Sequence, residues 1–152
     1  MLYLLSAVVF LPVLGAIILA FFPKNWDEVI RWFTLAVTVT VLALISVAFM
    51  TQTFDGKLVW TGEDARHMQD TFSVSWIGSF DIYYFMGVDG ISFPLLVLTA
   101  FISVLAMGAS WSIKKQVKAY CILFLLLETG MLGVFMALDF FLFYVFWEVM
   151  LL

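Results

Sequence analysis

Long apolar runs alternate with short polar segments along most of this chain. Runs of about 20 residues occupy 2–22, 29–50, 91–111 and 119–138, and another begins at 140 and continues to 152. A run of this length is what an α-helix needs to cross the roughly 30 Å hydrocarbon core of a bilayer. The pattern therefore predicts an all-α polytopic membrane protein with four transmembrane helices and a truncated fifth.

The last two runs are separated only by Asp139, which follows Ala137 and Leu138. A single straight helix over 119–152 would be about 50 Å long, well beyond the thickness of the hydrocarbon core. The chain must therefore turn. We interpret Asp139 as the residue at this turn or as the cap of the helix that follows.

Residues 51–90 form the one long polar loop, in which a small β-hairpin is predicted. Thr71–Trp76 alternates polar and apolar residues, 77–79 has the composition of a turn, and a second segment begins at Asp81. An isolated hairpin is marginally stable in water, so we expect this one to pack on the helical bundle or on a neighbour. Asp89, just before the third run, is a candidate helix cap, and His67 is interpreted as a solvated surface residue.

The composition supports a membrane protein and excludes several other classes. Hydrophobic residues make up 65% of the chain and charged residues 12%, whereas a soluble domain is closer to half apolar and a quarter charged. The net charge of −4 comes mainly from acids in the long loop, and nothing resembles a nucleic-acid-binding surface. A single cysteine, Cys121, excludes an internal disulfide and a thiolate metal cluster held by this chain alone. The first run is longer than a signal-peptide core and has no basic residue before it, so we expect an uncleaved span.

The distribution of Lys and Arg predicts the orientation. Five of the seven basic residues flank the first and third runs on one side: Lys24, Arg31, Lys114, Lys115 and Lys118. Cytoplasmic loops are enriched in such residues, so the turn carrying Lys114–Lys118 is expected in the cytoplasm and the N-terminus and long loop outside. The tryptophans near the ends of the runs fit an aromatic belt: Trp26, Trp32, Trp76 and Trp111.

Two glutamates are the candidate functional residues. Glu148 lies nine residues after Asp139, and Glu128 lies nine residues after the start of the fourth run, so both reach about 13–14 Å into the membrane. A carboxylate in hydrocarbon is costly and usually functional, since it can bind and release a proton there. Tyr144, one turn before Glu148, is a possible hydrogen-bond partner. No predicted span carries a lysine, so a cationic partner must come from beyond residue 152 or from another chain.

A structural role is the alternative for each glutamate. Glu148 can be a protonated carboxyl bonded to a neighbouring helix, and Glu128 can serve packing beside Gly130 and Gly133. The lysines of the cytoplasmic turn are interpreted mainly as determinants of topology. Whether Glu128 and Glu148 face each other does not follow from the sequence.

Several segments resemble a known family. Gly87-Val88-Asp89-Gly90 with the following Ile-Ser-Phe-Pro-Leu, the stretch Leu127-Glu128-Thr129-Gly130, and above all Phe146-Trp147-Glu148 resemble subunit M (chain 4), an antiporter-like subunit of respiratory complex I. The resemblance covers the whole chain as the N-terminal fragment of such a subunit. It implies a proton-translocating NADH:quinone oxidoreductase, in a bacterial-type inner membrane, in which the glutamate at position 148 serves the proton channel with a lysine on a later helix. Glu128 is a possible second proton relay.

The resemblance also implies where the redox chemistry lies. NAD, FMN, iron–sulfur clusters and quinone are expected on partner subunits, with no cofactor and no metal on this chain. The expected partners are the other membrane subunits of complex I and the lipid bilayer. Two other interpretations remain open. The chain can be a subunit of a Mrp-type sodium/proton antiporter, which also uses a paired glutamate and lysine, or a non-catalytic membrane or assembly fragment.

Overall fold

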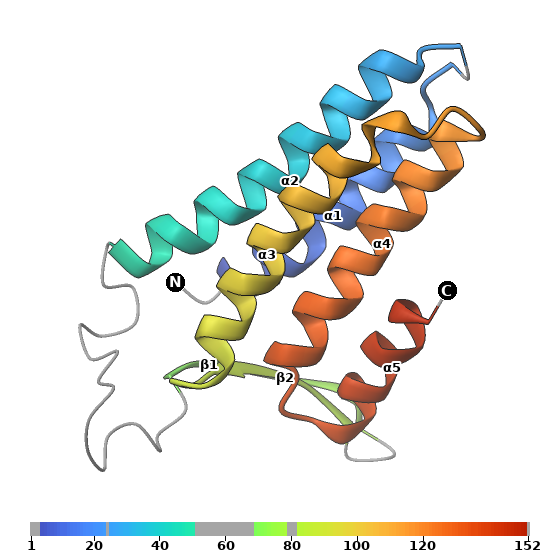
Figure 1. Ribbon diagram of the computed structural model, residues 1–152. Coiled ribbons are helices and arrows are strands. Elements are labelled where there is room, and N and C mark those ends of the chain that lie inside the picture. Colours follow the sequence, from blue (N-terminus) through green and yellow to red (C-terminus); the bar gives the residue numbers. More distant parts are fainter. Residues whose placement is uncertain (1–3, 24, 51–68, 79–81, 152) are drawn as a thin grey trace.

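The computed structural model describes residues 4–23, 25–50, 69–78 and 82–151. Four helices run alongside one another, a β-hairpin lies across one end of them, and a shorter helix lies beside the fourth (Figure 1). The elements of the described residues are α1 Leu4–Ala20, α2 Asp27–Met50, β1 Gln69–Ile77, β2 Ile82–Val88, α3 Ser92–Ala109, α4 Val117–Met136 and α5 Phe140–Met150. One 3₁₀ turn, η3 Ser110–Ser112, extends α3.

The helices confirm the apolar runs as helical segments. Each begins and ends within about two residues of its predicted bounds, as expected from the uncertainty of helix ends. Three are long and apolar enough to cross a membrane, at Asp27–Val47, Ser92–Ser112 and Val117–Met136. The helices α1 and α5 are equally apolar but shorter, so length and composition establish three candidate spans among the described residues rather than the four and a partial fifth that we predicted.

The predicted hairpin is confirmed, and it packs on the bundle. β1 and β2 pair antiparallel, with Val74 opposite Tyr84. The N–H of Leu138 donates to the carbonyl of Phe85 at 2.9 Å, and the Ser6 and Tyr84 hydroxyls are 2.9 Å apart. The hairpin is thus joined to α1 and to the turn between α4 and α5. Residues 51–68, with His67, and the turn residues 79–81 lie outside the described part of the chain.

Basic side chains join the helices at the opposite end of the bundle. The Arg31 guanidinium donates to the carbonyl of Ile113 at 2.6 Å, which connects α2 to the turn between η3 and α4. The Lys118 ammonium donates to the carbonyls of Ala20 and Phe22, each at 2.8 Å. A cation at these carbonyls complements the negative end of the α1 dipole.

The hydrophobic core is divided into two clusters along the bundle axis, with α4 at its centre in contact with α1, α2, α3 and α5. The hairpin-side cluster includes, among others, Val9, Val41, Met86, Leu96, Ala100, Leu132, Met136 and Phe146. The lysine-side cluster comprises Ala16, Leu19, Ile30, Met107, Val117, Cys121 and Leu125. On α2, α3 and α4, buried polar residues lie between the two clusters.

Candidate functional site

Glu128 lies at the boundary between the two clusters on α4. Leu125, one turn before it, belongs to the lysine-side cluster, and Leu132, one turn after it, belongs to the hairpin-side cluster. Both Glu128 and Thr129 are buried, with Glu128 completely inaccessible. The sequence placed Glu128 near the middle of its helix, and the structure places it in the middle of the bundle as well.

The same interruption occurs on the two helices that precede α4. On α3, Ser103 lies between Ala100 of one cluster and Met107 of the other, and it is buried. On α2, two buried threonines lie between Ile30 and Val41. We refer to these five side chains as the buried polar layer: Thr34, Thr38, Ser103, Glu128 and Thr129. They are all of the buried polar or charged residues in the part of the chain that the structure describes.

The hydrogen bonding of this layer is incomplete. The three threonine hydroxyls donate to carbonyls of their own helices, at 2.8 to 3.1 Å. Ser103 Oγ and both carboxyl oxygens of Glu128 have no hydrogen-bond partner among the described residues. An unpaired buried polar group is costly, and a buried charge without a partner far more so, which favours the neutral carboxylic acid. The layer can therefore hold a proton inside the bundle.

Glu148 lies in a different environment, on the exposed side of α5. It follows the buried Phe146 by two residues, or about 200° around the helix axis. Tyr144 is 51% exposed on the same side, and its phenol interacts with the Glu148 carboxylate, so the predicted pair is brought together. Of the two glutamates, the one that the described residues bury is Glu128, and the two are not hydrogen-bonded to each other.

Two glycines fix the rotation of α5. A Cβ added at Gly133 would overlap the ring of Phe146, and one at Gly130 would lie 2.9 Å from the backbone nitrogen of Met150. Small residues that allow such close approach are typical of helix contacts in membranes. Gly130 and Gly133 thus form a close packing contact with α5 on the helix that carries Glu128. Because Phe146 points into α4, Glu148 points away from it.

The two aspartates predicted as caps are confirmed in that role. Asp139 is the N-cap of α5, and its Oδ1 accepts from the N–H groups of Phe141 and Leu142 at 2.8 and 3.2 Å. Asp89 Oδ1 accepts from Ser92 at 2.6 Å and Ile91 at 3.1 Å at the start of α3. Burial alone would raise the pKa of Asp89, but these hydrogen bonds to the carboxylate outweigh it and lower the pKa.

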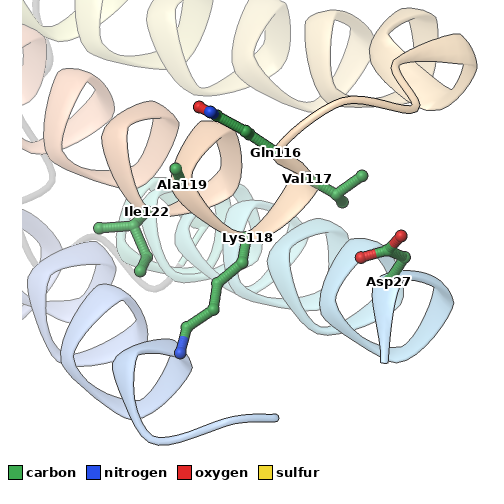
Figure 2. A pocket seen from close by; sticks show the side chains of 6 residues that line it. All are labelled: Asp27, Gln116, Val117, Lys118, Ala119 and Ile122. Carbon is green, nitrogen blue, oxygen red and sulfur yellow. The ribbon is translucent and has the colours of Figure 1, made fainter. Parts of the chain in front are cut away.

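A surface pocket of about 450 Å³ opens at the lysine end of the bundle, and it contains neither glutamate of interest (Figure 2). Its lining residues are Asp27, Gln116, Val117, Lys118, Ala119 and Ile122. The Lys118 side chain extends toward the end of α1, where its ammonium already donates to two carbonyls. The Lys118 ammonium at this pocket therefore stabilises the contact between α4 and the end of α1.

Sequence reasoning did not single out Ser103. The signal was present, because Leu96, Ala100, Ser103 and Met107 recur at spacings of four, three and four, which marks one face of a helix. A hydroxyl in this otherwise apolar series indicates a polar position in the core. The series was hard to recognise because α3 is apolar on most of its surface.

Comparisons with known proteins agree on one family. Residues 67–138 match the family model described as NADH-ubiquinone oxidoreductase chain 4, amino terminus. The chain is 34% identical over 148 residues to NAD(P)H-quinone oxidoreductase chain 4 3 of Picosynechococcus, covering 97% of this chain and 26% of the relative. It is 32% identical to the chloroplastic chain 4 of Mesostigma viride over 97% of this chain and 28% of the relative. The chain thus spans about a quarter of the length of these curated relatives.

Proposed function

The chain belongs to the family of NADH-quinone oxidoreductase chain 4, as its amino-terminal region, and we propose that it is part of a membrane subunit that translocates protons. Electron transfer from NADH to quinone in other subunits of the complex drives the translocation. The observation that carries this proposal is the presence of carboxyl groups deep in two neighbouring apolar helices, Glu128 on α4 and Glu148 on α5. Such groups inside a membrane are rare and usually mark an ion pathway.

Glu148 is the proton-carrying carboxyl of the channel, with Tyr144 as its hydrogen-bond partner. Its side of α5 also carries Trp147, which is 41% exposed, and it meets further protein in the complete subunit. This contact excludes lipid from the carboxylate and brings in a cation, since the basic residues of the described helices, Arg31 and Lys118, are bonded to backbone carbonyls elsewhere. A movable cation near a buried carboxyl changes its proton affinity, because an opposite charge favours the ionised form and burial favours the neutral one.

Glu128 is a second proton relay, held in the buried polar layer.

All five helices cross or enter the membrane, with the hairpin and the N-terminus outside and the turn of Lys114–Lys118 in the cytoplasm. The outward position of the hairpin follows from the excess of basic residues at the other end of the bundle. The membrane is the inner membrane of a bacterial-type cell.

This chain contributes no redox chemistry of its own. NAD, FMN, iron–sulfur clusters and quinone bind to partner subunits, and the chain's partners are the other membrane subunits and the bilayer. The similarity to chain 4 of quinone oxidoreductases supports this assignment of roles, since the names of those relatives identify them as chains of a larger oxidoreductase.

The test compares two driving reactions in membrane vesicles that contain the complete complex. NADH oxidation is expected to drive proton uptake that quinone-site inhibitors abolish and that does not require sodium. Sodium-dependent proton exchange without NADH would instead identify a Mrp-type antiporter. Absence of both activities, with the subunit present in the membrane, would favour a non-catalytic assembly role.

A further inference from the structure

The buried polar layer contains two residues whose hydrogen bonding is unfulfilled, and they lie at the same level of the bundle. Ser103 is nine residues from the end of η3, and Glu128 is eleven residues from the start of α4, at the same end of the bundle. These positions lie about 14 Å and about 17 Å from that end, respectively. Both residues lie between the two hydrophobic clusters, and α3 packs directly on α4. The two side chains therefore share one interhelical layer.

A direct hydrogen bond does not join them. Neither carboxyl oxygen of Glu128 nor the hydroxyl of Ser103 has a partner within hydrogen-bond distance among the described residues. Three buried oxygen atoms in one layer would lose several hydrogen bonds if they stayed unpaired. Buried water commonly satisfies such groups, provided that two to four polar atoms surround it.

The charged groups around Glu128 do not stabilise its ionised form. The helices α1 and α3 carry no charged residue, and Glu148 faces away on α5. On α2, Asp27, Glu28 and Arg31 lie in the first turns, and the Arg31 guanidinium is bonded to Ile113 at the end of the bundle. Lys118, ten residues before Glu128, is bonded to the end of α1. The neutral acid is therefore the resting form.

We propose that Glu128 and Ser103 form a buried hydration site, in which at least one water molecule bridges the protonated carboxyl of Glu128 and the hydroxyl of Ser103. The O–H group of the Glu128 carboxylic acid donates a hydrogen bond to the water, and the water donates one to Ser103 Oγ. The ligand is thus water together with a single exchangeable proton, rather than a cation. This inference deepens the proposed relay role of Glu128, and its functional meaning rests on that role. The hydration site itself can be tested separately by infrared spectroscopy.

The test is infrared difference spectroscopy on the complete, purified complex. A carbonyl band of a protonated carboxyl is expected that is lost in Glu128→Gln and shifts in deuterated water. In Ser103→Ala the band is expected to move to higher frequency, because the hydrogen-bonded chain is broken. Water enriched in ¹⁸O is expected to shift an O–H band that both variants lack.

Thr34→Val is the matched control. It also removes a buried hydroxyl from the layer, but this hydroxyl is bonded to the Ile30 carbonyl and contacts Cys121, about two turns from Glu128 on α4. The Glu128 band is expected to stay in place in this variant.

Four outcomes would overturn the proposal. Absence of a protonated-carboxyl band from Glu128 would mean an ionised group, and a band that appears only after sodium removal would identify a cation site. A band indifferent to Ser103→Ala, or the lack of any ¹⁸O-sensitive water band, would exclude the bridge. None of these outcomes bears on whether Glu148 supports proton pumping, so the two proposals fail independently.

Discussion

Glu128 and Glu148 have similar depths along their helices but different surroundings. Glu128 is fully buried on α4 and has no hydrogen-bond partner among the described residues, whereas Glu148 lies on the outer side of α5 beside Tyr144. The difference arises from packing. The ring of Phe146 packs directly against Gly133 of α4, so Glu148 lies on the side of α5 that faces away from α4. A fully buried carboxyl such as that of Glu128 suits the storage of a proton. An exposed carboxyl such as that of Glu148 can exchange one hydrogen-bond or ion-pair partner for another.

Replacing Glu128 by leucine distinguishes a role of the carboxyl in proton storage from a role in the stability of the subunit. An apolar side chain of similar size removes two buried carboxyl oxygens that have no hydrogen-bond partner among the described residues, and with them the cost of burying the carboxyl group. We expect Glu128→Leu to assemble, to keep or raise the temperature at which the subunit aggregates from the solubilised complex, and to lower NADH-driven proton uptake. Clear destabilisation with undiminished uptake would show that the carboxyl has a structural role instead.

At the scale of the elements, the contact between α4 and α5 determines which side of α5 is available. The contact depends on Gly130 and Gly133, where backbone and ring approach too closely for a Cβ. The N-cap Asp139 starts α5 directly after the turn, so the helix leaves the hairpin end alongside α4. A short helix with one tight contact is sensitive to small changes at that contact.

A pair of glycine-to-alanine substitutions tests this contact. We expect Gly133→Ala to destabilise the packing of α5 by about 1–3 kcal/mol, because the added methyl group overlaps Phe146. Gly108→Ala is the control, since an added Cβ meets nothing within 4 Å and an alanine in a helix stabilises by about 0.4–1 kcal/mol. Protease resistance of the turn at Asp139 measures both, and equal effects of the two variants would contradict the close contact.

The positions of the helices were predictable from the sequence, but the side of each helix that packs into the bundle was not. Long apolar runs and the polar turns between them determine where helices start and stop, and Asp139 and Asp89 were recognisable as caps. The rotation of α5 was not predictable, because residues 140–147 are apolar on every side and carry no periodic signal. The layer of Ser103 and Glu128 was missed for a related reason, since only the packing of α3 on α4 places the two residues at one level.

At the scale of the whole molecule, the two ends of the bundle differ in chemistry. One end is covered by a hairpin whose second strand, β2, bonds to α1 and to the turn after α4. The other end holds Arg31 and Lys118, both bonded to helix-end carbonyls, and an edge-to-face contact between Trp32 and Trp111 at 5.0 Å. Tryptophan and basic residues are enriched where a protein meets the membrane surface.

The orientation can be measured with single cysteines. With Cys121 replaced by serine, Lys115→Cys is expected to react with a membrane-impermeant maleimide only in inside-out vesicles, and Ser75→Cys only in right-side-out vesicles. Lys115 and Ser75 are both exposed and lie at opposite ends of the bundle, so access is set by sidedness. The reverse pattern would invert the proposed topology.

The proton role of Glu148 is the central claim, and Glu148→Gln in the assembled complex tests it most directly. The measurement is NADH-driven proton uptake by inside-out membrane vesicles, normalised to the amount of assembled complex. Glu28→Gln is the matched control, since Glu28 is an exposed residue in the first turn of α2. We expect Glu148→Gln to lose most proton uptake while the control keeps it, because an amide cannot bind and release a proton. Normal uptake in an assembled Glu148→Gln complex would contradict the claim.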